Sequence, residues 1–140
     1  MKELSPEASA KLLKIGRSPT NQTREVLRKL FSDKGVPVFD SVIETFVQFG
    51  GYRLPVPFEN GGDFKIYQAK EAIRLMNCRP ETTVDPNLFR IPFGESKTIQ
   101  AYFLMDGNGT LYEDEKPISK SMVDWIERWA KSAKCLHALS

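Results

Sequence analysis

The chain has few of the residues from which most metal and redox sites are built. It has two cysteines, Cys78 and Cys135, which form no CxxC pair, and one histidine, His137. Zinc and dithiol redox sites need closely spaced cysteines or histidines, so we expect neither, and we expect both thiols to stay free. His137 lies near the C-terminal end of the sequence, where side chains rarely have the fixed geometry that a catalytic base needs. Catalytic triads built on histidine are therefore not expected.

The sequence also lacks a charge excess and long apolar runs. Its 20 basic and 18 acidic residues give a formal charge of +2 over 140 residues. Nucleic-acid binders usually carry a clear basic excess, so no nucleic-acid partner is expected. No segment approaches the ~20 apolar residues of a membrane span, and the opening MKELSPEASAKLLKIG is charged and unlike a signal peptide. The sequence predicts a soluble, cytoplasmic protein without membrane contact.

The first half of the sequence has the apolar spacing of amphipathic helices. Ser5 followed by Pro6 predicts a helix start, and Gly16 predicts its end. A second helix is predicted to stop at Gly35, and a short one covers Gln68–Met76. The apolar positions of the second helix are Val26, Leu27, Leu30 and Phe31, and those of a third helix over Phe39–Gln48 are Phe39, Val42, Ile43, Phe46 and Val47.

After Gly51 the pattern changes to short strands separated by turns. Asp106–Gly109 predicts a hairpin turn, because glycine and asparagine tolerate positive φ, and Phe93–Ser96 predicts another turn. Ser119 is predicted to cap a closing helix. The predicted strands are Tyr52–Leu54, Phe64–Tyr67, Leu88–Pro92, Ile99–Met105 and Thr110–Tyr112. The order predicts one α+β domain over residues 1–140, with N-terminal helices, a small and mostly antiparallel sheet, and a C-terminal helix packed on it.

The glycine pairs Gly50-Gly51 and Gly61-Gly62 do not have the context of a phosphate-binding loop. A dinucleotide fingerprint needs a strand before its glycines and a helix after them, whereas both pairs precede predicted strands. We instead expect Gly50 or Gly51 to close the third helix in the left-handed conformation. Asp106–Gly109 lacks the later acidic ligands of a calcium loop. No metal, cofactor or catalytic set is therefore expected.

Three segments resemble, in their order and spacing, the signatures of a known superfamily. Phe49-Gly50-Gly51 ends the predicted third helix, Ile91-Pro92-Phe93-Gly94-Glu95 follows, and Asp106 to Tyr112 reads DGNGTLY. Over about Leu12 to Trp129 this series is similar to the SUKH superfamily. The resemblance implies a single α+β domain without cofactor or catalysis. It also implies an immunity protein, which binds and blocks a protein toxin, often a nuclease or deaminase, delivered by a neighbouring bacterial cell.

Two functional alternatives stay open beside toxin neutralisation. One is a regulatory interaction module, as in eukaryotic members of the superfamily. The other is a small hydrolase that uses Glu44 or Glu95 with water, although the carboxylate spacing selects no pair. An acidic patch is expected if the loops with Glu59, Asp63, Glu113, Asp114 and Glu115 share one edge of the sheet. The residues expected to contact the toxin are Tyr52, Phe58, Glu59, Asp63, Tyr112 and Asp114.

Overall fold

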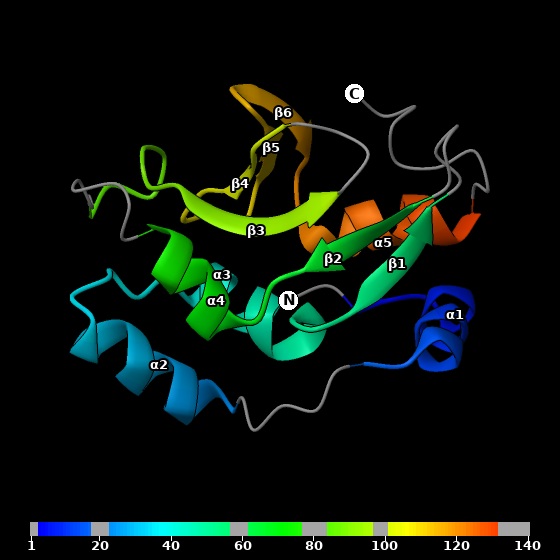
Figure 1. Ribbon diagram of the computed structural model, residues 1–140, viewed down its shortest axis with the longest axis horizontal. Coiled ribbons are helices and arrows are strands. Elements are labelled where there is room, and N and C mark those ends of the chain that lie inside the picture. The colour runs from blue at the N-terminus through cyan, green and yellow to red at the C-terminus, as the bar shows by residue number, and fades with distance from the viewer. Residues whose placement is uncertain (1–2, 18–22, 57–61, 77–83, 97–100, 132–140) are drawn as a thin grey trace.

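A six-stranded antiparallel sheet forms the centre of the protein (Figure 1). The computed structural model describes residues 3–17, 23–56, 62–76, 84–96 and 101–131. Each strand pairs with the next one along the chain, in the order β1-β2-β3-β4-β5-β6. The strands are β1 (Arg53–Val56), β2 (Gly62–Ile66), β3 (Ile91–Ser96), β4 (Phe103–Met105), β5 (Leu111–Glu113) and β6 (Lys116–Ser119). The α+β prediction is confirmed.

Five helices surround this sheet in the described parts of the chain, and three have side-chain N-caps. Ser5 accepts from the Ala8 amide at 3.2 Å, and Thr23 accepts from the Val26 amide at 3.2 Å. The closing helix is capped by Ser121, whose Oγ accepts from the Asp124 amide at 3.1 Å. The predicted cap Ser119 is wrong, because that residue ends β6. The helices are α1 (Pro6–Ile15), α2 (Arg24–Asp33), α3 (Asp40–Phe49), α4 (Ala69–Met76) and α5 (Met122–Lys131).

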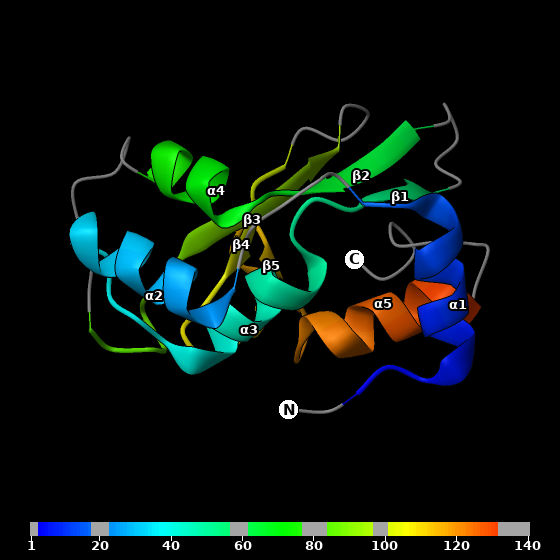
Figure 2. The same ribbon diagram turned by 90° about the horizontal axis from the view of Figure 1, so that it is seen from below.

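The aromatic centre of the hydrophobic core lies between one face of the sheet and α5, and buried residues of α2, α3 and α4 extend the core. Trp125 of α5 is fully buried and meets Phe64 of β2 edge-on, with 4.8 Å between ring centroids. Phe93 of β3 meets the same indole at 5.6 Å, and Phe103 of β4 meets Phe64 at 4.8 Å. Edge-to-face pairs of this kind contribute about 0.5–1.5 kcal/mol each beyond their buried area. Figure 2 shows α1 beside α5, so this face of the sheet, the α5 face, is covered.

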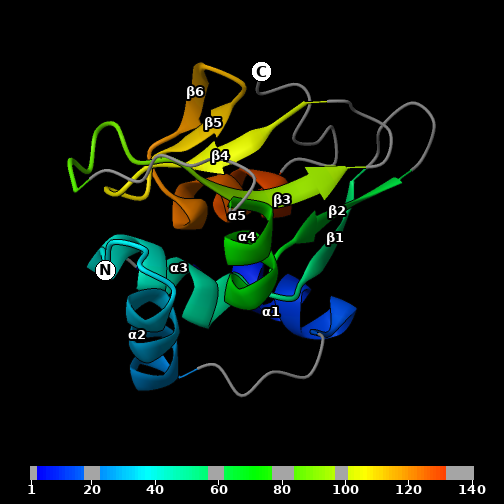
Figure 3. The ribbon, with the colours of Figure 1, turned by 60° about the vertical axis from the view of Figure 1, so that its left-hand side comes forward.

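The opposite face carries α4. This helix connects β2 to β3 and packs along β3, and Figure 3 shows it in front of β3 with α5 behind. Because side chains alternate along a strand, Pro92 points away from the α5 face when Phe93 points toward it. We call this side the α4 face. One helix of eight residues spans it, so part of its sheet surface stays open.

The strands predicted from the sequence are wrong in the middle and at the end of the sheet. Phe93–Ser96, predicted as a turn, belongs to β3, and Leu88 lies before the strand. The glycine has a packing role: a Cβ at Gly94 would lie 2.5 Å from the Lys65 carbonyl oxygen on β2. The strand β6 was missed altogether. In α2, Val26 is 51% exposed and does not face the core, whereas Leu27 and Phe31 do.

Candidate functional site

An apolar groove of about 450 Å³ lies on the α4 face, between the end of α4 and strands β3 and β4. Two of its large hydrophobic lining side chains are open to solvent, since Leu75 is 42% exposed and Tyr102 is 68% exposed. Arg90 and Glu95 supply its charged lining. The apolar groove is defined by Tyr67, Leu75, Met76, Pro92, Tyr102 and Leu104. Exposed apolar side chains gathered in a hollow are typical of a binding surface.

Tyr67 lies at the inner end of the groove and keeps its proton at neutral pH. Burial of the phenol, followed by the negative charges of Glu95 and Glu71, raises the pKa of Tyr67 to about 12. The Lys65 ammonium lies 5.9 Å from its ring centroid and 2.9 Å from the Glu71 carboxylate. A phenol with this pKa donates hydrogen bonds but does not serve as a base near pH 7.

A second hollow, of about 320 Å³, lies beside β1 and β2 on the same face. Its lining includes four cations, Arg53, Lys65, Lys70 and Arg74, and we call it the basic cleft. Glu71 is the one acid in this lining, and it pairs with Lys65. The α4 helix contributes Lys70, Glu71 and Arg74 to the cleft, and Leu75 and Met76 to the groove. The two hollows therefore flank one helix.

Tyr112 and Asp114, two predicted contact residues, lie near the groove but also support the fold. The Tyr112 hydroxyl donates to Asp106 Oδ2 at 2.9 Å, and burial followed by that hydrogen bond raises the pKa of Tyr112. The Arg90 guanidinium lies 4.1 Å from the centroid of the Tyr112 ring. Asp114, at φ 57°, accepts from the Tyr102 amide at 3.0 Å. Asp114 therefore adjoins the exposed Tyr102 of the groove.

The turn Asp106–Gly109 is held by one buried carboxylate. Asp106 is 3% exposed, and its Oδ1 accepts from the amides of Asn108 at 2.8 Å and Thr110 at 3.0 Å. The Gly107 amide donates to the Pro86 carbonyl at 2.8 Å, and a Cβ there would lie 2.6 Å from Pro86 Cα. The predicted hairpin is confirmed. These contacts show that Asp106, Gly107 and Tyr112 stabilise the turn.

Tyr52, a third predicted contact residue, lies apart from the groove, beside the end of α3. Arg17 forms a β-bridge with it and places its guanidinium 5.2 Å from the Tyr52 ring centroid. The same guanidinium donates to the carbonyls of Gly50 at 2.7 Å and Val47 at 2.6 Å. Burial lowers the pKa of Arg17 from its ordinary value. Arg17 was missed from the sequence, because nothing local links it to a helix end about thirty residues later.

The two glycines after α3 have different conformations. Gly51 has φ 94°, as expected of one of the pair, whereas Gly50 has φ −58° and its amide donates to the Phe46 carbonyl at 3.0 Å. Gly50 is thus the C-cap of α3, and its φ −58° and ψ 132° form an extended backbone that any residue can adopt. The chain reverses at Gly51, whose amide donates to the Ile66 carbonyl at 2.9 Å.

The remaining predicted contact residues are only partly placed. Phe58 and Glu59 lie outside the described residues. Asp63 lies on β2, where its backbone pairs with Pro55 of β1. Glu113 lies on β5, and β3 and β4 separate β5 from β2. The pairing registers place Asp63 at the start of β2 and Glu113 at the end of β5, which lie at the same end of the sheet, and the acidic patch stays a prediction.

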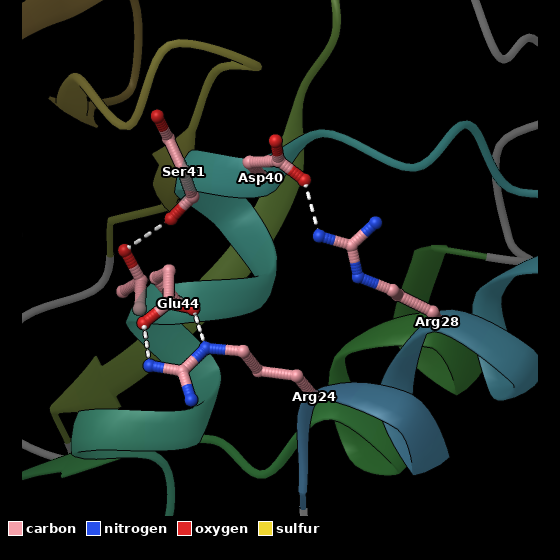
Figure 4. Close-up of polar contacts among 6 residues, drawn as sticks. Arg24, Arg28, Asp40, Ser41 and Glu44 are labelled. Atoms are coloured by element: carbon pink, nitrogen blue, oxygen red, sulfur yellow. Dashed lines mark hydrogen bonds and ion pairs between the residues drawn. The ribbon is translucent and has the colours of Figure 1, made fainter. Parts of the chain in front are cut away.

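The two carboxylates considered for hydrolysis lie in different parts of the fold. Glu44 of α3 forms a two-pronged ion pair with Arg24 of α2, which lowers the pKa of Glu44 (Figure 4). The neighbouring Arg28–Asp40 pair, at 2.6 Å, also links α2 to α3. Glu95 instead lines the groove on the α4 face. Nothing in this arrangement directs the two carboxylates at one substrate atom.

Metal-binding groupings are absent from the part of the chain that the structure describes: no three His, Cys, Asp or Glu side chains there could hold one ion. Cys78, Cys135 and His137 lie outside it. Within the same described ranges, no helix is long and apolar enough to cross a membrane.

Comparison with known proteins gives no assignment. No protein-family model matches the chain, and neither a curated protein nor a solved structure matches it.

Proposed function

We propose that this protein is a binding module that neutralises a protein toxin by covering it, with the α4 face as the contact surface. The observation that supports this most is the apolar groove, where Leu75 and Tyr102 are exposed beside buried Met76 and Leu104. The immunity role itself is inferred from the SUKH-like segments around Gly50, Gly94 and Gly109.

The composition of the α4 face suits protein recognition. Tyr and Arg are the residue types that most often anchor protein interfaces, and the groove offers Tyr102 with Arg90 at its edge. A stable interface buries ~800 Å² on each partner. The apolar groove and the basic cleft, on either side of α4, supply anchor points within such an area, and surrounding polar residues supply the rim.

The hydrolase alternative has weaker support. It needs carboxylates aimed at one bond or water, and Glu44 is held ionised by Arg24 far from Glu95. A hydrogen bond to Glu95 is among the causes that raise the pKa of Tyr67, so the donor of this buried hydroxyl is already used within the groove. A binding role does not require a base.

The proposal is tested by co-expression with the toxin encoded by the adjacent gene. We expect growth to be restored and a complex of the two proteins to be recovered by affinity purification and gel filtration. A toxin that still kills, together with no recovered complex, would contradict the proposal. Growth that is restored without a complex would also contradict it, because occlusion requires binding.

A further inference from the structure

The charge of the basic cleft is concentrated in a small area. Its lining holds four cations, Arg53, Lys65, Lys70 and Arg74, and one carboxylate, Glu71. That local excess is larger than the formal charge of +2 for the whole chain. The positive potential of the protein is therefore directed to one side of α4 rather than spread over its surface.

Two pairs of like charges meet in the cleft. Arg53 of β1 lies directly opposite Lys65 of β2 in the antiparallel register, so both side chains share one face. Lys70 and Arg74 stand four residues apart on α4, which also makes them neighbours. Like charges in either arrangement repel each other. This repulsion opposes the placement of the four cations within the fold.

Glu71, the one carboxylate of the cleft lining, already forms an ion pair within the protein. Glu71 Oε2 lies 2.9 Å from Lys65 Nζ. Among the residues that the structure describes, Lys70 and Arg74 make no ion pair, and both are exposed. Two cations are thus left to bind an anion from outside the protein.

The positive surface continues past α4 to α2. A smaller hollow of about 180 Å³ is lined by Leu30, Lys34, Lys70, Ile73 and Arg74. It shares Lys70 and Arg74 with the basic cleft. On the other side, Leu75 begins the apolar groove. A partner crossing α4 therefore meets several separated cations and then an apolar hollow.

We propose that the basic cleft binds carboxylates, so that the partner toxin presents an acidic surface patch with an apolar residue beside it. This inference rests on the proposed function, of which it names the partner's chemistry. Carboxylates fit better than a nucleic-acid backbone, because Glu71 inside the cleft and Glu95 in the adjoining groove would repel a continuous run of phosphates. Carboxylates of a protein can be placed singly around those two acids.

The test is a titration of the protein with a peptide of about six glutamates. Two-dimensional amide NMR monitors the binding. A glutamine peptide of the same length and a single-stranded oligonucleotide of about 12 nucleotides are the comparisons. We expect the glutamate peptide to shift amides of β1, β2 and α4 and to bind more tightly than both comparisons. Raising salt from about 50 to about 300 mM should weaken it.

The matched variants separate the cleft from general charge. The double variant Lys70→Glu/Arg74→Glu should weaken binding of the glutamate peptide at least about tenfold. The control Lys29→Glu/Lys120→Glu makes the same change of net charge at exposed positions outside the cleft lining and should leave affinity within about twofold. The cleft variant should keep its midpoint of thermal unfolding, because both positions are exposed and the repulsion between two cations is replaced by a similar repulsion between two carboxylates.

Three results would overturn the cleft inference. One is equal binding of the glutamine peptide, a second is amide shifts outside β1, β2 and α4, and the third is tighter binding of the oligonucleotide, which would make the cleft a nucleic-acid site. The outcome is distinct from that of the proposed function. A toxin complex that forms but tolerates Lys70→Glu/Arg74→Glu would contradict the cleft and leave neutralisation standing. Peptide binding without any toxin complex would contradict neutralisation and leave the carboxylate-binding cleft standing.

Discussion

Asp106 shows at the residue scale how a surface hairpin becomes a fixed part of the fold. Its buried carboxylate accepts from two turn amides through Oδ1 and from the Tyr112 hydroxyl through Oδ2. A buried carboxylate is costly unless its oxygens are hydrogen-bonded. The spacing from Asp106 to Tyr112 therefore has a physical cause, because the tyrosine supplies a donor to the outer oxygen.

We predict that Tyr112→Phe lowers the free energy of unfolding by about 1–2 kcal/mol, because Asp106 Oδ2 loses a donor while staying buried. Urea denaturation followed by circular dichroism measures this. Tyr52→Phe is the control: its ring keeps the contact with Arg17, so stability should change by less than about 0.5 kcal/mol. Equal effects of the two variants would show that the Asp106 contact does not stabilise the hairpin.

At the scale of elements, the end of α3 depends on a partner that is distant in sequence. The last carbonyls of a helix need donors from outside it, and the Arg17 guanidinium supplies them to Val47 and Gly50. Gly51 then reverses the chain with φ 94°, and Tyr52 leads into β1. The helix end, the connection before α2 and the first strand are thus joined at one point.

We predict that Gly51→Ala lowers the free energy of unfolding by about 1 kcal/mol or more, because alanine resists positive φ. Gly50→Ala should cost less, since Gly50 has φ −58°. Thermal and urea unfolding of the two variants give the comparison. An equal loss of unfolding free energy in both variants would contradict this explanation, because the positive φ of Gly51 would then not be the cause.

The local parts of this fold could be predicted from the sequence, and the non-local parts could not. Ser5 and Gly16 give the bounds of α1, and Asp106–Gly109 gives the β4–β5 turn, because each signal acts within a few residues. The strand identity of Gly94 depends on its close approach to Lys65 of β2. The basic cleft depends on the register that sets Arg53 opposite Lys65. Neither contact leaves a local pattern.

At the scale of the whole molecule, the two faces of the sheet have different roles. The α5 face buries Phe64, Phe93 and Trp125 and stabilises the domain. The α4 face is covered by one short helix, which leaves the apolar groove and the basic cleft open on either side. A rigid sheet with one open face suits a protein that binds by occlusion, because little conformational entropy is lost on association.

The affinity of the complex with the adjacent-gene toxin, measured by isothermal titration calorimetry, tests the α4 face most directly. Leu75→Asp places a charge in the apolar groove, and Leu13→Asp makes the same change on α1, where Leu13 is 78% exposed. We predict that Leu75→Asp weakens binding at least about tenfold, whereas Leu13→Asp changes it less than about twofold. Equal affinities of the two variants would contradict the account, because the groove would then lie outside the interface.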